Sequence, residues 1–440
     1  MSGITAQIPN NNIAERKYII SAMFADILHI EPPQIDVADT LCTTLSCDGR
    51  TIVFRDHLWN AHPEPLSYLD SRNLPRPTLC SNPFAPEKDI VALYGNEEFT
   101  IADNTITCGL DIWASAFFML TRWEEYCNPV RDEHGRFPAD ESTALKHNFL
   151  HRPVVNEYAE MLRRIMEHLK FDTAPKKARY QPILTHDIDI LQSNSKLKSI
   201  AGDLLKRHDL RLALSHIDEP RNVYDTYNFL MDQSEKAGTQ SIFFFMASDH
   251  RLGHSGNYLS TKKFATTIET IRHRGHTIAF HAGHGTADNP QQYADELELL
   301  RRKTGLDITF SRQHFLKFNV PTTFNTLENN GIQTDFSLGY SQCEGFRCGT
   351  GNKFRVFDII GRKTLNIREQ PLIIMDSTLN LTKHLSPDDA EKLIIKYLDM
   401  AQRYNMPITL LFHNTSFDNY LWKGWKQLYI NIINHICQQQ

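Results

Sequence analysis

Two aspartates near the middle of the chain follow a run of apolar residues and are separated by one residue. This spacing can place both carboxylates in one reactive site. Ile183 and Leu184 predict the end of a short buried strand, which continues into Thr185-His-Asp-Ile-Asp189. Because successive side chains of a strand point to opposite faces, Asp187 and Asp189 are expected on one face, with Cα atoms roughly 7 Å apart. Two carboxylates at this separation ionise together only beside a positive charge, which favours a divalent metal next to a general base. The competing interpretation is a pair of solvated turn acids.

The length and charge of the chain limit its architecture and its partners. With 440 residues it exceeds one ordinary domain, and we expect two or three, each with its own core. The formal net charge of −5 gives no general attraction to nucleic acid or anionic lipid, so neither is expected as a partner. No apolar run approaches the ~20 residues that a membrane span requires. Residues 1–12 do not resemble a secretory signal and the cysteines are scattered, so we expect a cytoplasmic protein with reduced thiols.

The first part of the chain mixes helical and strand patterns. Apolar residues recur at helical spacing over residues 13–30, 112–126 and 154–169, and short strands are predicted over 51–54 and 106–108. Asp111 is a suitable N-cap for the second helix, whose tryptophans and phenylalanines predict a face buried in the core. The polar segment 172–177 predicts a boundary between a smaller α/β domain of unknown role, residues 1–175, and a second domain, residues 176–440.

After residue 180 strand patterns alternate with helical ones. Strands are predicted over 183–186, 241–247, 276–281, 307–311, 333–337, 365–367 or 372–375, and 408–413. Helices are predicted over 224–236, 262–274, 291–303 and 387–404, with Ser386 as the N-cap of the last. This alternation predicts parallel strands with crossover helices, arranged either as a barrel or as an open doubly wound sheet.

Residues able to do chemistry stand at the ends of several of these strands. They are Asp187 and Asp189 after the first strand, Asp249 after the second, His281 at the third, Arg312 and His314 after the fourth, and His413 at the last. A packed sheet has no need of a polar group at each strand end. In a (β/α) barrel the active site forms at the carboxyl ends of the strands, so we expect these side chains to converge there.

The residue types predict a metal centre with a proton donor and acceptor beside it. One carboxylate and two imidazoles suit zinc or another first-row divalent ion, and Asp189 and His281 are the first candidates. His284 is the third, since Ala282-Gly283 can form a tight turn between the two rings; the alternative is a turn histidine with no role in binding.

Amide or ester hydrolysis further needs a base and an acid. Asp187 is the expected base and His413 the expected acid. Arg312 either pairs with Asp187, which lowers the pKa of that carboxyl, or holds the substrate; the alternative is a structural salt bridge.

At these residues the chain resembles the polysaccharide deacetylase superfamily, which has the NodB-homology fold of carbohydrate esterases. The segment Thr185–Asp189 resembles its Thr-Phe-Asp-Asp motif, His281-Ala-Gly-His284 its His-x-x-x-His motif, Ser311-Arg-Gln-His314 its Arg motif, and Leu411-Phe-His413 its Leu-x-His motif. The order is the same over residues 180–420. Gly345-Phe-Arg-Cys-Gly-Thr350 and His413-Asn-Thr-Ser416 resemble a divergent bacterial branch linked to surface polysaccharide loci, in which an α/β domain precedes the deacetylase-like domain.

The resemblance implies a distorted (β/α)7-type barrel that removes an N-acyl group, such as acetyl, from a sugar or glycan precursor. The expected cofactor is a divalent metal: zinc first, with cobalt, nickel or another first-row ion as alternatives. We assign catalysis to Asp187, His413 and Arg312, metal binding to Asp189, His281 and His284, and substrate binding to His314, Arg347 and Asn414. Arg347 is expected on a glycine-rich loop over the mouth of the site, where a guanidinium suits a carboxylate or phosphate on the substrate; the alternative is an arginine that stabilises the turn.

Two departures from the family pattern keep other hypotheses open. Ile188 separates the two acids, which are adjacent in the family, and the two histidines stand three residues apart rather than four. Either change can move or remove the metal site, because a fold can be kept while its chemistry is lost. One alternative is a catalytically silent protein that binds a glycan or a partner protein, with sugar stacking on Phe315, Phe318, Tyr340 and Phe346. Another is a metal-independent hydrolase of a cyclic amide.

Overall fold

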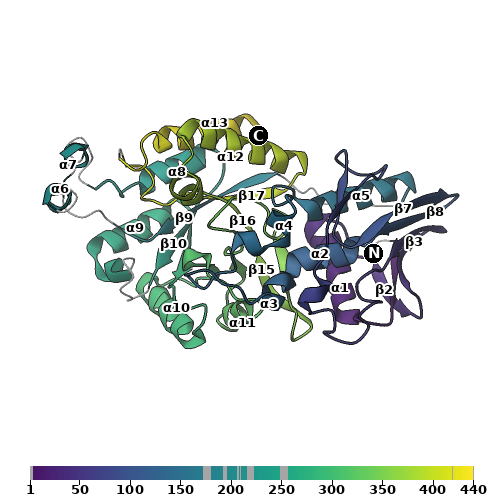
Figure 1. Ribbon diagram of the computed structural model, residues 1–440. Coiled ribbons are helices and arrows are strands. Elements are labelled where there is room, and N and C mark those ends of the chain that lie inside the picture. Colours follow the sequence, from purple (N-terminus) through teal and green to yellow (C-terminus); the bar gives the residue numbers. More distant parts are fainter. Residues whose placement is uncertain are drawn as a thin grey trace.

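The first strands of the chain form a six-stranded mixed sheet, at the right of Figure 1. The computed structural model describes residues 3–171, 180–191, 196–205, 208, 210–215, 222–247, 256–418 and 420–439. The strands of this sheet are β1 (Thr5–Pro9), β2 (Gln34–Ala38), β3 (Cys42–Cys47), β4 (Arg50–Arg55), β7 (Gly95–Ala102) and β8 (Thr105–Leu110), in the order β2-β1-β3-β4-β8-β7. Along β3 buried residues alternate with half-buried ones, as expected where only one face of a sheet is packed against a core. β5 (Thr78–Cys80) and β6 (Ile90–Ala92) pair separately.

Helix α2 (Ile112–Thr121) joins this sheet to the rest of the molecule. All of its residues are buried, so it must be covered on every side. Trp113 packs edge-on against Phe54 of the six-stranded sheet, with ring centroids 5.4 Å apart. Phe117 packs in the same way against Phe357 of β14 (Phe354–Asp358), at 5.6 Å. The predicted role of this aromatic stripe as core is confirmed, and the predicted N-cap Asp111 accepts a hydrogen bond from the amide of Ala114.

Two helices predicted in the first part of the chain are interrupted. The helix expected over 112–126 breaks at Arg122, whose φ of 54° is left-handed, and α3 (Trp123–Cys127) follows it. The helix expected over 13–30 consists of α1 (Ile13–Ala22) and a π-helical turn (Met23–Ile27). α5 (Val154–His168) matches its predicted range.

The second large sheet has nine strands in the order β14-β15-β13-β12-β11-β10-β9-β17-β16. Every neighbouring pair is parallel except β14 with β15. Besides β14, the strands are β9 (Gln181–Ile188), β10 (Ile242–Met246), β11 (Thr277–Ala282), β12 (Phe310–Gln313), β13 (Thr334–Asp335), β15 (Lys363–Glu369), β16 (Leu372–Met375) and β17 (Pro407–Leu411). Parallel strands with both faces covered require continuous apolar runs, and Ile242–Met246 is buried throughout.

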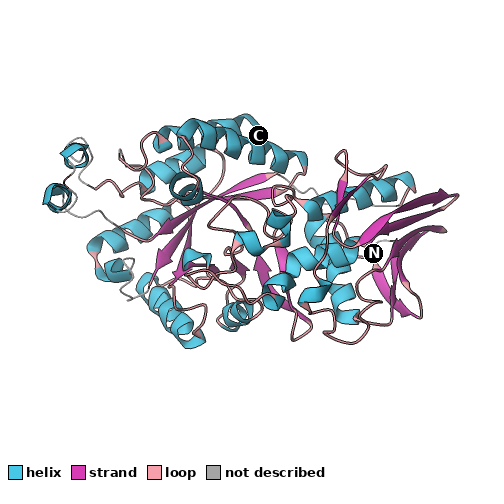
Figure 2. Ribbon diagram, in the orientation of Figure 1, coloured by secondary structure: helices cyan, strands magenta, loops and turns pink. Residues whose placement is uncertain are grey.

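Helices lie around the outside of this sheet, and several follow the strands in the predicted alternation (Figure 2). They are α8 (Tyr227–Lys236), α9 (Lys262–His273), α10 (Pro290–Thr304), α11 (Thr322–Asn329), α12 (Pro387–Arg403) and α13 (Trp425–Gln439), while α6 (Lys196–Leu205) and α7 (Leu210–Ser215) project at the left of Figure 1. Ser386 accepts the capping hydrogen bond from Asp389, as predicted. The predicted mixed α/β class is confirmed.

The nine-stranded sheet is curled, and Gln370 ties its two sides together. Only Gln370 and Pro371 separate β15, near one end of the strand order, from β16 at the other. The Gln370 amide donates to Asp335 O of β13 at 2.8 Å, and its side chain donates to Thr409 Oγ1 of β17 at 3.1 Å. A closed arrangement of seven β/α units stays a prediction.

The predicted boundary between residues 175 and 176 lies outside the described residues, so the division into two domains stays a prediction. Asp249, expected after the second strand, also lies outside them. Among the helices of the described ranges, none is both long and apolar enough to cross a membrane. All eight cysteines are free thiols.

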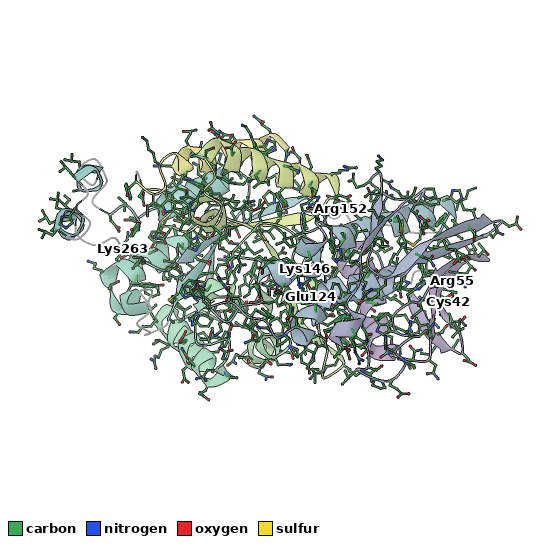
Figure 3. The ribbon with its side chains drawn as sticks, viewed as in Figure 1. Cys42, Arg55, Glu124, Lys146, Arg152 and Lys263 are labelled. Carbon is green, nitrogen blue, oxygen red and sulfur yellow. The ribbon has the colours of Figure 1, made fainter. Side chains whose placement is uncertain are left out.

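A buried ionic network connects α3 to the curled sheet, close to Glu124 in the middle of the molecule (Figure 3). Arg347 binds both carboxylate oxygens of Glu125, at 2.9 and 2.6 Å, and donates to Gly339 O at 2.7 Å. Arg122 donates to Glu125 at 2.9 Å and to Tyr340 Oη at 3.2 Å. Burial alone would raise the pKa of Glu125, but Arg347 and Arg122 hold it below its usual value. Glu125 is therefore ionised, and it fixes the segment from Gly339 to Arg347.

We expect Arg347→Ala to destabilise the protein by about 3–5 kcal/mol, because it removes one partner of a buried carboxylate. The free energy of unfolding from urea denaturation measures this loss. Arg403→Ala is the matched control: Arg403 pairs with Glu87 at 2.9 Å but is 58% exposed, so its loss should cost less than about 1 kcal/mol. Equal effects of the two substitutions would contradict the structural role of Arg347.

Candidate active site

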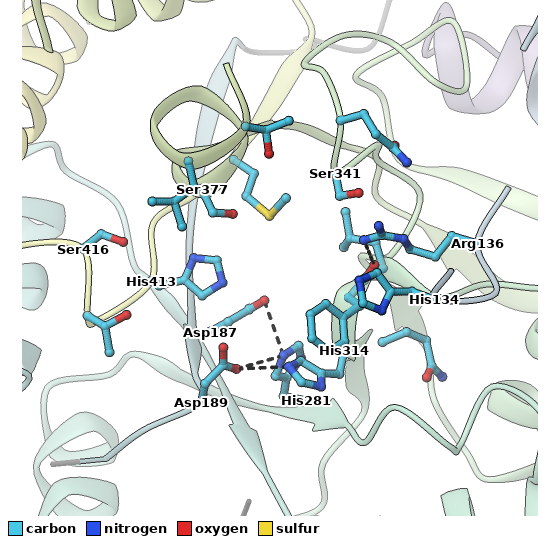
Figure 4. A pocket seen from close by; sticks show the side chains of 18 of the residues that line it. His134, Arg136, Asp187, Asp189, His281, His314, Ser341, Ser377, His413 and Ser416 are labelled. Carbon is cyan, nitrogen blue, oxygen red and sulfur yellow. Dashed lines mark hydrogen bonds and ion pairs between the residues drawn. The ribbon is translucent and has the colours of Figure 1, made fainter. Parts of the chain in front are cut away.

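A cavity of about 480 Å³ opens at the carboxyl ends of the parallel strands (Figure 4). Its lining includes Asp187 and Asp189 from the end of β9, His281 from the end of β11, His314 directly after β12, and His413 two residues beyond β17. The parallel register places these strand ends side by side, as in other (β/α) arrangements. Five of the predicted site residues therefore face one space.

Arg312 holds Asp187 in place at the base of this cavity. Its Nη1 donates to Asp187 Oδ1 at 2.7 Å, its Nη2 to Thr185 Oγ1 at 3.0 Å and its Nε to Phe336 O at 3.1 Å. The guanidinium also lies 4.3 Å from the ring centroid of Phe244. Burial alone would raise the pKa of Asp187, but Arg312 holds it below its usual value. Asp187 is thus a carboxylate at neutral pH, and its Oδ2 lies 3.7 Å from His281 Nε2.

Asp189, His281 and His314 form a cluster whose ligand atoms all lie within 4.8 Å of one another. Asp189 Oδ1 is 3.3 Å from His281 Nε2 and 4.0 Å from His314 Nε2. His281 Nδ1 lies 3.1 Å from Arg312 O, so a proton on that nitrogen leaves the Nε2 lone pair directed at the cluster. Two imidazole nitrogens and one carboxylate oxygen are the donor set of open, catalytic zinc sites. The residues fit a divalent first-row ion.

His413 is paired with a buried acid. Asp376 Oδ1 lies 2.8 Å from His413 Nδ1, and Asp376 Oδ2 accepts the His413 amide at 2.7 Å. Burial alone would lower the pKa of His413, but Asp376, with Asp189 and Asp187 nearby, raises it to about 10 in the metal-free pocket. The imidazole is therefore protonated at neutral pH, and the contact of Asp376 with Nδ1 fixes its orientation. Such a group can donate a proton to a leaving group.

Three predicted residues lie away from this constellation. His284 is absent from the cavity lining, and its ring contacts those of His134 and Phe315. The turn that begins at Gly283 directs the chain away from the cluster, and His314, assigned to the substrate, occupies the third position in its place. Arg347 is buried against Glu125 and does not lie over the mouth.

Asn414 is buried as well, and its side chain donates to Ile190 O at 2.9 Å and to Tyr224 O at 3.0 Å. It holds the strand-end segments next to the cavity together rather than lining it.

The sequence reasoning missed other residues of the site. Asp376 directly follows the strand Leu372–Met375, and an acid at a strand end was the signal that could have identified it. His134 and Arg136 line the cavity from the part of the chain before the curled sheet, where the sequence analysis assigns no site residue. His186, next to Asp187, binds Phe412 O and Ser241 Oγ; burial lowers its pKa to about 4, so it is a neutral structural group.

The cavity also has an apolar part. It is lined there by Phe315, Leu316, Met375, Leu381 and Trp422. Of the four aromatic residues considered for sugar stacking, Phe315 lies in this lining, whereas Phe318, Tyr340 and Phe346 are buried elsewhere. An apolar wall beside a few convergent polar groups is typical of small-molecule sites.

Residues 4–171 match a family of unknown function (DUF7033), and no curated protein matches the chain. Among solved structures, the chain is similar to a candidate polysaccharide deacetylase from Mycobacterium smegmatis, at 14% identity and a TM-score of 0.40, over 60% of this chain and 86% of that one. A family 4 carbohydrate esterase from Streptomyces lividans, solved with acetate, is similar at 11% identity and a TM-score of 0.29, over 59% of this chain and 87% of that one. A polysaccharide deacetylase from Bacillus cereus is similar at 11% identity and a TM-score of 0.28, over 57% of this chain and 86% of that one. TM-scores below 0.5 do not establish a shared fold, so the architecture rests on the strand pairing described above.

We expect His314→Ala to weaken Zn²⁺ binding by at least about 100-fold, since even residues that only orient a ligand contribute 10–100-fold. His284→Ala is the matched control and should leave the affinity within about threefold of the unsubstituted protein, because its ring lies outside the cluster. Calorimetric titration of the metal-free proteins measures both. A larger loss for His284→Ala than for His314→Ala would restore the ligand set expected from the sequence.

Proposed function

We propose that this protein is a metal-dependent hydrolase that removes an acyl group from an N-acylated sugar or glycan precursor. The observation that supports it is the convergence of an ionised Asp187, a protonated His413 and a three-residue metal-type cluster on one cavity. Amide hydrolysis needs a base for water, stabilisation of the developing oxyanion, and an acid for the departing nitrogen.

Asp187 would act as the base. Arg312 occupies its Oδ1, which leaves Oδ2 on the side of His281 to accept a proton from a water molecule in the cavity. The buried ion pair keeps the carboxylate charged and prevents its rotation. Arg312 itself is fully buried and is absent from the cavity lining, so its part is to position Asp187.

His413 would act as the acid. Because Asp376 binds Nδ1, Nε2 is the nitrogen that would donate the proton into the cavity, which His413 lines. Proton donation to the amine would complete the cleavage. Asp376 stabilises the imidazolium before this step and fixes the ring plane.

Asp189, His281 and His314 would hold the divalent ion, which when bound supplies Lewis-acid activation of the acyl carbonyl and of water. The apolar residues of the lining provide a surface for a sugar ring and an acyl methyl group, and the volume of about 480 Å³ falls in the range of small-molecule sites. Zinc is the metal we would test first.

We expect Asp187→Asn to lower kcat for acetate release from N-acetylated sugars by about 10²–10⁴, the usual contribution of a general base. Asp307→Asn is the control, because that acid is 86% exposed and lies outside the cavity lining. Acetate is measured with the zinc-loaded protein. Unchanged turnover in Asp187→Asn would exclude its role as base, and turnover that survives EDTA would favour the metal-independent alternative.

We expect Asp376→Asn to move the alkaline limb of the kcat pH profile to lower pH by roughly one unit or more. His413 must be protonated to act, so activity falls as the pH rises through its pKa, and removal of the Asp376 charge lowers that pKa. Asp399→Asn is a matched control, because Asp399 pairs with His435 at 3.0 Å on the surface, and it should leave the profile unchanged. An alkaline limb that stays in place would show that His413 is not the acid.

A further inference from the structure

The turn from Asp132 to Arg136 lies in the part of the chain before the curled sheet and is held rigid by Asp132. Asp132 Oδ1 accepts the amides of His134 at 3.0 Å and Arg136 at 2.9 Å. Asp132 Oδ2 pairs with Arg136 Nε at 2.7 Å. Gly135 supplies the φ of +75° that the turn requires. His134 and Arg136 are therefore presented in fixed orientations.

This turn packs against the segment that contains His314, one of the three residues of the candidate metal-binding cluster. Arg136 Nη1 donates to Phe315 O at 3.2 Å, and the His134 ring stacks on the Phe315 ring with centroids 4.9 Å apart and planes within 4°. From the other side, Gln342 Nε2 donates to Asp132 Oδ2 at 3.3 Å. Phe315 directly follows His314, so the turn contacts the residue next to a member of the candidate metal-binding cluster.

His134 and Arg136 face the cavity from the side opposite Asp189 and His413, as Figure 4 shows. Ser341 lines the same wall. If water attacks the acyl carbonyl carbon beside Asp187, this wall lies within reach of another part of the substrate. His134 and Arg136 precede residues 172–179 in the chain, whereas Asp189 and His413 follow them.

We propose that His134 and Arg136 form a subsite for the sugar unit next to the acylated one, binding its hydroxyl or ring oxygens as hydrogen-bond donors. The inference rests on the proposed function and assigns a role to the region matched by the family of unknown function. Asp132 neutralises the charge of the Arg136 guanidinium, so this group is suited to a neutral sugar. Its planar, fixed N–H groups select acceptor oxygens by the geometry of the hydrogen bonds. The substrate is then at least a disaccharide or an equally extended sugar conjugate.

The test compares two acetyl substrates on the zinc-loaded protein: 4-nitrophenyl acetate, which has no second sugar, and di-N-acetylchitobiose, which has one. Arg136→Met should raise KM for the disaccharide about tenfold or more with kcat little changed, because a hydrogen bond from a charged donor contributes ~1.5–3 kcal/mol. It should lower kcat/KM for 4-nitrophenyl acetate by much less than kcat/KM for the disaccharide, because the smaller substrate has no second sugar to contact Arg136. Arg136→Lys, which keeps a charge beside Asp132 but loses the planar fork, should show the same selective loss.

Arg72→Met is the matched control. Arg72 pairs with Asp70, an aspartate close to it in the same part of the chain, at 2.7 Å, but its side chain is 86% exposed and outside the cavity. An unchanged KM for the disaccharide in both Arg136 variants would overturn the subsite. Equal losses on the two substrates would also overturn it, because they would indicate a structural role only.

Failure of the hydrolase proposal is distinguishable from failure of the subsite. If the unsubstituted protein hydrolyses neither substrate, the hydrolase proposal fails, and calorimetric binding of di-N-acetylchitobiose decides the subsite. Binding that weakens tenfold or more in Arg136→Met, but not in Arg72→Met, would support it. Absent binding, or equal binding by all three proteins, would overturn it.

Discussion

The buried ion pair between Arg312 and Asp187 is the interaction on which the cavity depends. Removal of two charges from water costs several kcal/mol for each ion, and only close, well-directed partners offset that cost. Here the remaining donors of Arg312 bind Thr185 and the carbonyl of Phe336, so one guanidinium links β9, β12 and the segment after β13. The metal-type ligands are carried by the same strands or their neighbours: Asp189 follows β9, and His314 stands two residues after Arg312. The guanidinium that lowers the pKa of Asp187 therefore also joins the strands that carry Asp189 and His314.

The features that follow from backbone periodicity could be predicted from the sequence. Asp187 and Asp189 share a face because a strand has a period of two, and His281 reaches the same edge because parallel strands end together. The choice between His284 and His314 could not be made in this way. Both stand near a strand end, and the direction in which the chain leaves the strand depends on turns such as the left-handed backbone at Phe315, φ 59°, which spacing alone does not encode.

The first 171 residues were less predictable, for physical reasons. Several strands of the six-stranded sheet are half-buried and mixed in direction, so neither a continuous apolar run nor a regular strand-helix alternation marks them. At the break, Arg122 donates to the nearby Glu125 and to Tyr340, more than two hundred residues later in the chain, and Glu125 also holds Arg347. Arg347 was expected at the mouth because a glycine-rich segment suggests an exposed loop, but its carboxylate partner lies more than two hundred residues earlier in the chain.

The complete burial of α2 has a consequence for any shortened form of the protein. A helix that is apolar on every side belongs to two cores at once: Trp113 to the six-stranded sheet and Phe117 to Phe357 on the edge of the curled one. A shortened chain that starts at β9 would present that edge to water as a sticky apolar surface prone to aggregation. The curled sheet therefore relies on the preceding segment to cover this edge, and we expect both parts to be needed together for a well-folded chain.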